Sequence, residues 1–98
     1  MPAVTQLDGH TIQQMREILL RYGVTRAGIF GSFARGEADE TSDVDLLVEV
    51  PRGTTLFGLA RLERELAAAV GRQVDVVPYE SLHPGFRDDV LREERIIL

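Results

Sequence analysis

Two aspartates lie one residue apart at the start of an apolar run. Asp43 and Asp45 open segment 43–50, which reads DVDLLVEV. Residues i and i+2 of a strand point to the same face, and at about 3.3 Å per residue their Cα atoms lie roughly 6.6 Å apart. Two carboxylates at that spacing can converge on divalent metal ions held about 3.5–4 Å apart. The pair therefore predicts a metal site on a strand.

A Gly-Ser turn precedes this strand. Gly31 and Ser32 follow the apolar segment 24–30, and they offer backbone N–H groups and a hydroxyl to a phosphate. A phosphate-binding turn beside a metal site made of paired carboxylates is typical of enzymes that transfer phosphoryl or nucleotidyl groups. The plainer interpretation of Gly31-Ser32 is a turn with a helix N-cap. The two interpretations are compatible, since a capped N-terminus also attracts anions.

Residues 31–48, GSFARGEADETSDVDLLV, resemble the signature of the DNA polymerase β-like nucleotidyltransferases. More narrowly, they resemble the minimal nucleotidyltransferases that act as antitoxins to HEPN-domain toxins. The family pattern is Gly-Ser, Ala-Arg-Gly, a short variable loop and Ser-Asp-x-Asp-Leu. It stands here as Gly31-Ser32, Ala34-Arg35-Gly36 and Ser42-Asp43-Val44-Asp45-Leu46. An Asp-x-Asp alone is a weak signal, but this order and spacing make the match specific.

The resemblance implies a third carboxylate on a neighbouring strand, and Asp75 in QVDVV is the matching position. Taken alone, Asp75 would be a surface residue on a half-exposed strand. The resemblance further implies that Asp43, Asp45 and Asp75 are catalytic and hold two Mg²⁺ ions, with Asp75 also able to take the proton of an acceptor hydroxyl.

The resemblance also implies that ATP is the substrate, with Gly31 and Ser32 holding its β- and γ-phosphates. Arg35 has two open interpretations. It reaches the triphosphate, or it forms a salt bridge with Glu37 or Asp39.

The implied reaction is transfer of AMP from ATP to a tyrosine hydroxyl of a partner HEPN toxin, with which the chain would form a hetero-oligomer. The resemblance implies that larger relatives carry a helical domain that binds the acceptor; with 98 residues, we expect this chain to lack one and to take its acceptor from a partner. Two alternatives stay open. One is an antitoxin that blocks the toxin by stoichiometric contact, with a residual nucleotide site. The other is the catalytic subunit of a two-component small-molecule nucleotidyltransferase.

Length predicts a single domain spanning 1–98, and the resemblance implies that it is a minimal nucleotidyltransferase domain. The absence of cysteine excludes disulfides and thiolate metal sites. A net charge of −5 argues against nucleic-acid binding, which needs clustered basic charge. No apolar run is long enough to span a membrane, and the N-terminus has no signal-peptide pattern. We therefore expect a cytoplasmic protein without membrane or nucleic-acid partners.

The fold class predicted is α/β (α+β), in the order α-β-β-α-β-α, with a small three-stranded mixed sheet and helices packed mainly on one side. The resemblance implies that this arrangement is the polymerase β-like nucleotidyltransferase fold. Hydrophobic periodicity predicts helices over 11–22, 55–70 and 86–94, and strands over 24–30, 43–50 and 73–77. The first two strands should pair antiparallel and the last two parallel.

Several details of packing are also predicted. Asp8 or Thr11 should cap the first helix. The stripe of the second helix and the inward residues of the last should be buried: Leu56, Leu59, Leu62, Leu66 and Ala69, then Phe86, Val90 and Leu91. The tail Arg95–Leu98 either finishes the last helix or adds an edge strand.

Overall fold

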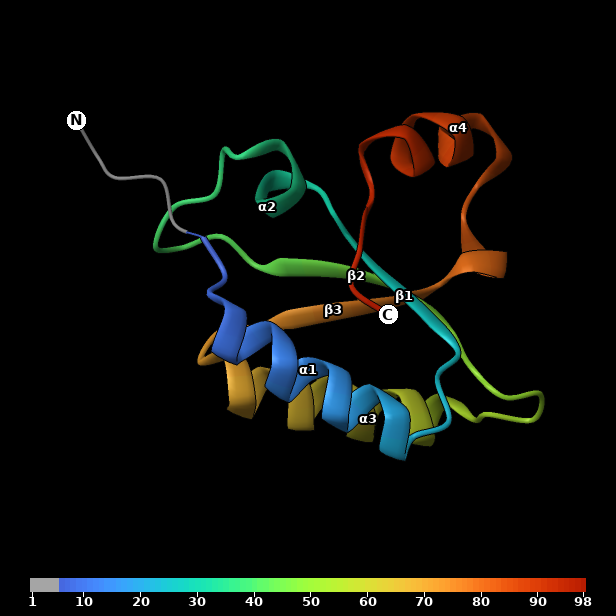
Figure 1. The fold of residues 1–98 in the computed structure, drawn as a ribbon. Coiled ribbons are helices and arrows are strands. Elements are labelled where there is room, and N and C mark those ends of the chain that lie inside the picture. Colours follow the sequence, from blue (N-terminus) through green and yellow to red (C-terminus); the bar gives the residue numbers. More distant parts are fainter. Residues whose placement is uncertain (1–5) are drawn as a thin grey trace.

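A four-stranded mixed sheet forms the centre of the computed structural model, which describes residues 6–98 (Figure 1). The strand order is β3-β2-β1-β4. β1 pairs antiparallel with β2, and β2 pairs parallel with β3, as predicted. The elements in chain order are α1 (Gly9–Arg21), β1 (Arg26–Phe30), α2 (Ser32–Arg35), β2 (Val44–Glu49), α3 (Leu56–Val70), β3 (Val74–Pro78), the 3₁₀ turn η1 (Tyr79–Ser81), α4 (Pro84–Glu93) and β4 (Arg95–Ile96).

The prediction of three strands is wrong by one strand. β4 pairs antiparallel with β1, with Ile96 opposite Gly28. The backbone N–H of Ile97 then donates to the carbonyl of Ala27 at 2.9 Å, and the N–H of Ala27 donates to the carbonyl of Leu98 at 3.1 Å. A two-residue strand is too short to carry a periodic pattern, so the sequence left the tail open between helix and edge strand, and the pairing confirms the edge strand.

The core lies between the sheet and the helix pair α1 and α3, which run side by side beneath it (Figure 1). Met15 and Leu19 of α1 and Leu66 of α3 are fully buried against Leu46 and Val48 of β2. Side chains alternate along a strand. Asp45, Leu47 and Glu49 therefore face the side of the sheet opposite to Leu46 and Val48. One face of β2 thus builds the core and the other carries the candidate site.

Helix boundaries differ from the prediction by a few residues. α1 begins at Gly9 because Asp8, and not Thr11, is its N-cap: the Asp8 carboxylate accepts a hydrogen bond from the Thr11 N–H at 2.7 Å. The last helix begins at Pro84, behind a cap formed by His83, whose Nδ1 accepts from the Gly85 N–H at 3.0 Å.

Two residues predicted to be buried are exposed. Leu56 is 83% exposed because it is the first residue of α3, ahead of the stretch that packs in the core. Phe86 is 65% exposed, and every residue of α4 is either exposed or half-buried. α4 lies on the opposite side of the sheet from α1 and α3 (Figure 1). No helix within residues 6–98 is both long and apolar enough to cross a membrane.

The turn from β1 into α2 depends on a glycine. Gly31 has φ 72° and ψ −150°, a backbone conformation that is essentially restricted to glycine. A Cβ at this position would overlap the Oδ2 atom of Asp45. The missing side chain therefore allows the turn to approach the carboxylate of β2 closely.

The core and the surface should respond differently to the same substitution. Leu66→Ala removes a fully buried side chain, so we expect the free energy of unfolding to fall by about 2–5 kcal/mol. Leu20→Ala is the matched control because Leu20 is 58% exposed, and its cost should stay within about 0.5 kcal/mol. Urea unfolding measures both. Equal losses for the two variants would contradict this description of the core.

Gly31 and Gly36 form a second matched pair, because both have φ 72°. Gly36 has ψ 25°, and a Cβ there would meet nothing within 4 Å, so Gly36→Ala should cost about 1 kcal/mol from the left-handed conformation alone. Gly31→Ala adds the overlap with Asp45 and should cost about 2–3 kcal/mol. Calorimetric unfolding compares them. A Gly31→Ala protein as stable as Gly36→Ala would show that the turn tolerates a side chain.

Candidate active site

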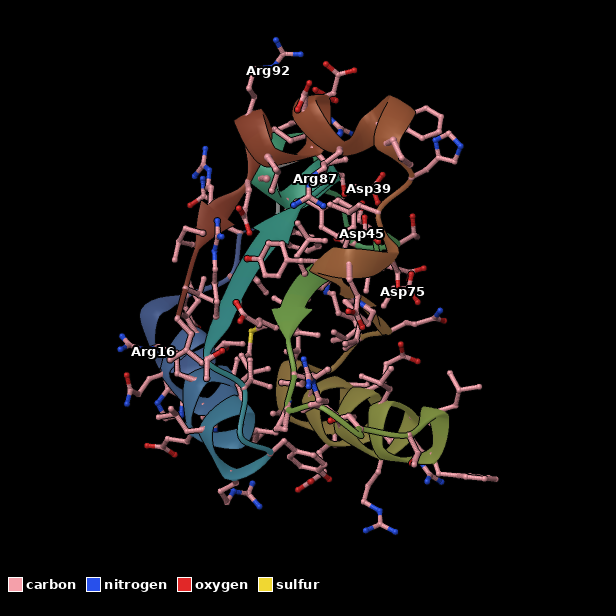
Figure 2. The ribbon with its side chains drawn as sticks, turned by 90° about the vertical axis from the view of Figure 1, so that its right-hand side faces the viewer. Arg16, Asp39, Asp45, Asp75, Arg87 and Arg92 are labelled. Carbon is pink, nitrogen blue, oxygen red and sulfur yellow. The ribbon has the colours of Figure 1, made fainter. Side chains whose placement is uncertain are left out.

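The register of the sheet brings two of the predicted carboxylates together. Asp45 of β2 lies directly opposite Asp75 of β3 in their parallel pairing. On its other side Asp45 lies opposite Phe30, the last residue of β1, so the Gly31-Ser32 turn follows immediately beside it. Figure 2 shows Asp45 and Asp75 close to each other on the same side of the molecule. Three separate elements thus meet at Asp45.

The electrostatics of the site centre on Asp45, which is half-buried. Burial raises the pKa of the Asp45 carboxyl above its usual value, and the negative charges of Asp75 and Asp43 raise it further. The Arg35 guanidinium opposes this shift. Mutual repulsion between carboxylates of this kind is reduced when a cation binds near them.

Asp43 lies just before β2 and is exposed. The acidic loop that leads to it is braced by Asp39, whose Oδ1 accepts from the Thr41 N–H at 2.9 Å and the Thr41 hydroxyl at 2.8 Å. The Ser42 hydroxyl also contacts this oxygen, at 3.2 Å. Ser42 therefore helps to turn the chain into the strand, and these hydrogen bonds order the loop that precedes Asp43.

Arg72 holds this loop from outside, and sequence reasoning missed it. Its Nη1 atom donates to the carbonyl oxygens of Asp39 and Ser42 at 3.0 and 2.8 Å. Its guanidinium also lies 5.0 Å from the ring centroid of Phe33 in α2. One side chain thus connects the Gly-Ser turn region to the acidic loop. An arginine just before a strand carries no local signal for such a contact.

The donor set suits a hard cation, because carboxylate oxygens are the ligands Mg²⁺ prefers. The structure pairs Asp45 with Asp75, but it does not draw all three aspartates into one cluster. Within residues 6–98, no three acidic or histidine side chains converge in a geometry that would hold a metal ion. The Oδ1 atom of Asp75 instead accepts a hydrogen bond from the Gln73 amide at 3.0 Å.

The Gly-Ser turn meets an anion that the sequence did not predict. The Gly31 N–H donates to Glu93 Oε1 of α4 at 3.1 Å. The Nη1 atom of Arg35 lies 3.3 Å from the same oxygen. Arg35 also contacts Glu37, with 3.4 Å between Nε and Oε2, so one of its two expected ion pairs is present. Glu93 is separated from Gly31 by most of the chain, and only the fold brings them together.

A second carboxylate anchors the end of α4. The side chain of Glu94 is 3% exposed; it accepts a hydrogen bond from the Tyr79 hydroxyl and lies 3.4 Å from Arg26 Nη2. Gly28 makes room for it, since a Cβ there would overlap the carboxylate. Burial and the hydrogen bond to Glu94 raise the pKa of Tyr79 above its usual value. Tyr79 therefore has a packing role beside the sheet.

A groove of about 700 Å³ lies near the far end of β2, lined by Glu49, Arg52, Tyr79 and Arg87 among others. None of the predicted site residues lines it. Tyr79 is held by Glu94, and Arg87 Nη1 contacts the Tyr79 carbonyl at 3.4 Å. This groove is therefore separate from the acidic site, and two of its polar residues, Tyr79 and Arg87, are engaged in internal contacts.

Two proteins that are similar in sequence to this chain are named as protein adenylyltransferases. A protein of Methanocaldococcus jannaschii, provisionally named a protein adenylyltransferase, is 53% identical over 78% of this chain and 82% of its own length. The protein adenylyltransferase MntA of Thermococcus cleftensis is 39% identical over 95% of this chain and 94% of its own length.

Solved structures agree on the fold. A structure described provisionally as a minimal nucleotidyltransferase matches with a TM-score of 0.78 and 42% identity, covering 88% of each chain. A tri-AMPylated Shewanella oneidensis HEPN toxin in complex with an MNT antitoxin matches with a TM-score of 0.72 over 91% of this chain and 70% of that one. Its 18% identity carries the fold alone.

The model of the nucleotidyltransferase domain matches residues 12–98, which includes the Gly-Ser turn and all three predicted aspartates. With the acid pair of β2 and β3 beside that turn, the chain belongs to the nucleotidyltransferase domain family.

Proposed function

We propose that this chain transfers AMP from ATP to a tyrosine hydroxyl of a partner HEPN-domain toxin, and so acts as its antitoxin. The observation that carries the proposal is the opposition of Asp45 and Asp75 across β2 and β3, directly beside the Gly31 turn. Its support from relatives is the 39% identical MntA, named a protein adenylyltransferase. The partner class follows the MNT antitoxin that shares this fold.

The reaction is an in-line displacement at the α-phosphorus of ATP. The acceptor oxygen forms a bond to this phosphorus, the bond to the bridging oxygen of the β-phosphate breaks, and pyrophosphate leaves. The acceptor proton passes to Asp75, whose position opposite Asp45 faces the same side of the sheet. The Gly31 N–H, the Ser32 hydroxyl and Arg35 hold the β- and γ-phosphates and orient the leaving group.

Asp43, Asp45 and Asp75 would hold Mg²⁺ in this proposal. When bound, it neutralises triphosphate charge and lowers the pKa of the acceptor hydroxyl. The repulsion that raises the pKa of Asp45, added to its burial, supports this use of the carboxylates. Asp43 is exposed, and its charge acts on Asp45.

Neutralising either paired aspartate should abolish transfer. We expect Asp45→Asn and Asp75→Asn to lower AMP transfer by at least about 100-fold, because each removes a carboxylate that handles charge or a proton in the transition state. Glu40→Gln is the matched control: it removes one exposed negative charge from the acidic loop and should retain activity. The measurement is radiolabel from α-labelled ATP on the cognate toxin, with folding checked by thermal unfolding. If Asp45→Asn labels the toxin as strongly as the wild-type protein does, the proposal is wrong.

Metal removal separates catalysis from simple contact. With EDTA present, both labelling of the toxin and neutralisation of its ribonuclease activity should disappear, and excess Mg²⁺ should restore them. Toxin treated with EDTA alone is the control. Neutralisation that persists in EDTA at one antitoxin per toxin would favour the stoichiometric alternative.

A further inference from the structure

Glu93 occupies the donors that the proposed reaction needs for its phosphates. Its Oε1 atom accepts from the Gly31 N–H at 3.1 Å and lies 3.3 Å from Arg35 Nη1. Its Oε2 atom lies 3.5 Å from the same Nη1. A carboxylate and a phosphate compete for donors of this kind because both are anions that accept charge-assisted hydrogen bonds. One anion already satisfies the turn.

Glu93 is the last residue of α4, a helix that packs loosely against the rest of the protein. Every residue of α4 is exposed or half-buried, and Phe86 leaves 65% of its surface exposed. The fixed point lies just beyond the helix, where the side chain of Glu94 is buried and bonded to Tyr79. Few buried contacts make local displacement inexpensive. Glu93 can therefore leave the turn by a side-chain rotation or a shift of α4 about Glu94.

We propose that Glu93 is an internal competitor for the triphosphate: its carboxylate occupies the Gly31 and Arg35 donors in the free protein, and nucleotide must displace it to bind. This inference rests on the proposed nucleotidyl transfer and adds a self-occupied state of the same site. The affinity for ATP is then set by two terms, the contacts of the triphosphate and the contacts that Glu93 gives up. A protein that lacks the competitor binds nucleotide more tightly.

The test is calorimetric titration with Mg·ATP of the whole chain. Glu93→Gln keeps the shape of the side chain and removes its charge, so the dissociation constant should fall by about three- to tenfold, the scale of one lost charge-assisted contact. Asp88→Asn is the matched control, because it removes the same charge from an exposed residue of the same helix; its change should stay below about twofold. Thermal unfolding checks that both variants fold.

A second readout follows the helix itself. Adding Mg·ATP to the wild-type protein should speed amide hydrogen exchange across residues 84–93, because the contact with Gly31 is released. In Glu93→Gln the same amides should already exchange faster before nucleotide is added.

Two different failures are distinguishable. If the wild-type protein binds Mg·ATP and Glu93→Gln binds it equally or more weakly, the proposal that Glu93 competes with the triphosphate is wrong, while the proposed function stands. Slower exchange of 84–93 on binding would overturn it in the same way, since α4 would then close over the nucleotide. If the wild-type protein and both variants bind no Mg·ATP, the proposed function itself falls.

Discussion

The alternation of side chains along β2 is the constraint on which the site depends. Leu46 and Val48 are completely buried against α1 and α3, so the strand cannot slip by one residue without moving its apolar set out of the core. Asp45 is thereby held on the opposite face, in register with Asp75. The hydrophobic effect on one face fixes the position of a carboxylate pair on the other. The core and the candidate chemistry are two sides of one strand.

That arrangement has a cost, which the surrounding residues reduce. Asp45 is half-buried among like charges, and the resulting rise of its pKa records an unfavourable ionised state. Arg35 opposes the repulsion, and Gly31 gives the turn room beside the carboxylate. Local strain and unfavourable charge of this kind are typical of functional sites.

The molecule has a well-packed part, the sheet with α1 and α3, and a loosely packed part, α4. The sheet with α1 and α3 contains the buried side chains, and it carries Asp45 and Asp75. α4 lies on the other side of the sheet, attached through Glu93 at the Gly-Ser turn and through Glu94 at Tyr79 (Figure 1). Arg87, in the first half of α4, also contacts the Tyr79 carbonyl, and a helix with few buried contacts is displaced at low cost in free energy. The paired carboxylates Asp45 and Asp75 lie on the well-packed part.

The sequence by itself determined what depends on short-range pattern. The Asp43 and Asp45 spacing, the Gly31-Ser32 turn, the main helices and the antiparallel and parallel pairings all follow from local periodicity and short connections, and the strand pairings have the predicted directions. The same local logic failed at element ends: Leu56 and Phe86 fit a helical stripe, yet neither reaches the core. A stripe shows which face of a helix is apolar and does not show where the helix meets its neighbour.

Only the tertiary structure decided the contacts between distant segments. These are the pairing of β4 with β1, the bond of Glu93 to Gly31, and the contact of Arg72 with the acidic loop. Each joins residues whose own neighbours in the sequence carry no sign of the partner. Such contacts form because the packed core brings their backbones within reach, and a local sequence pattern does not contain that information.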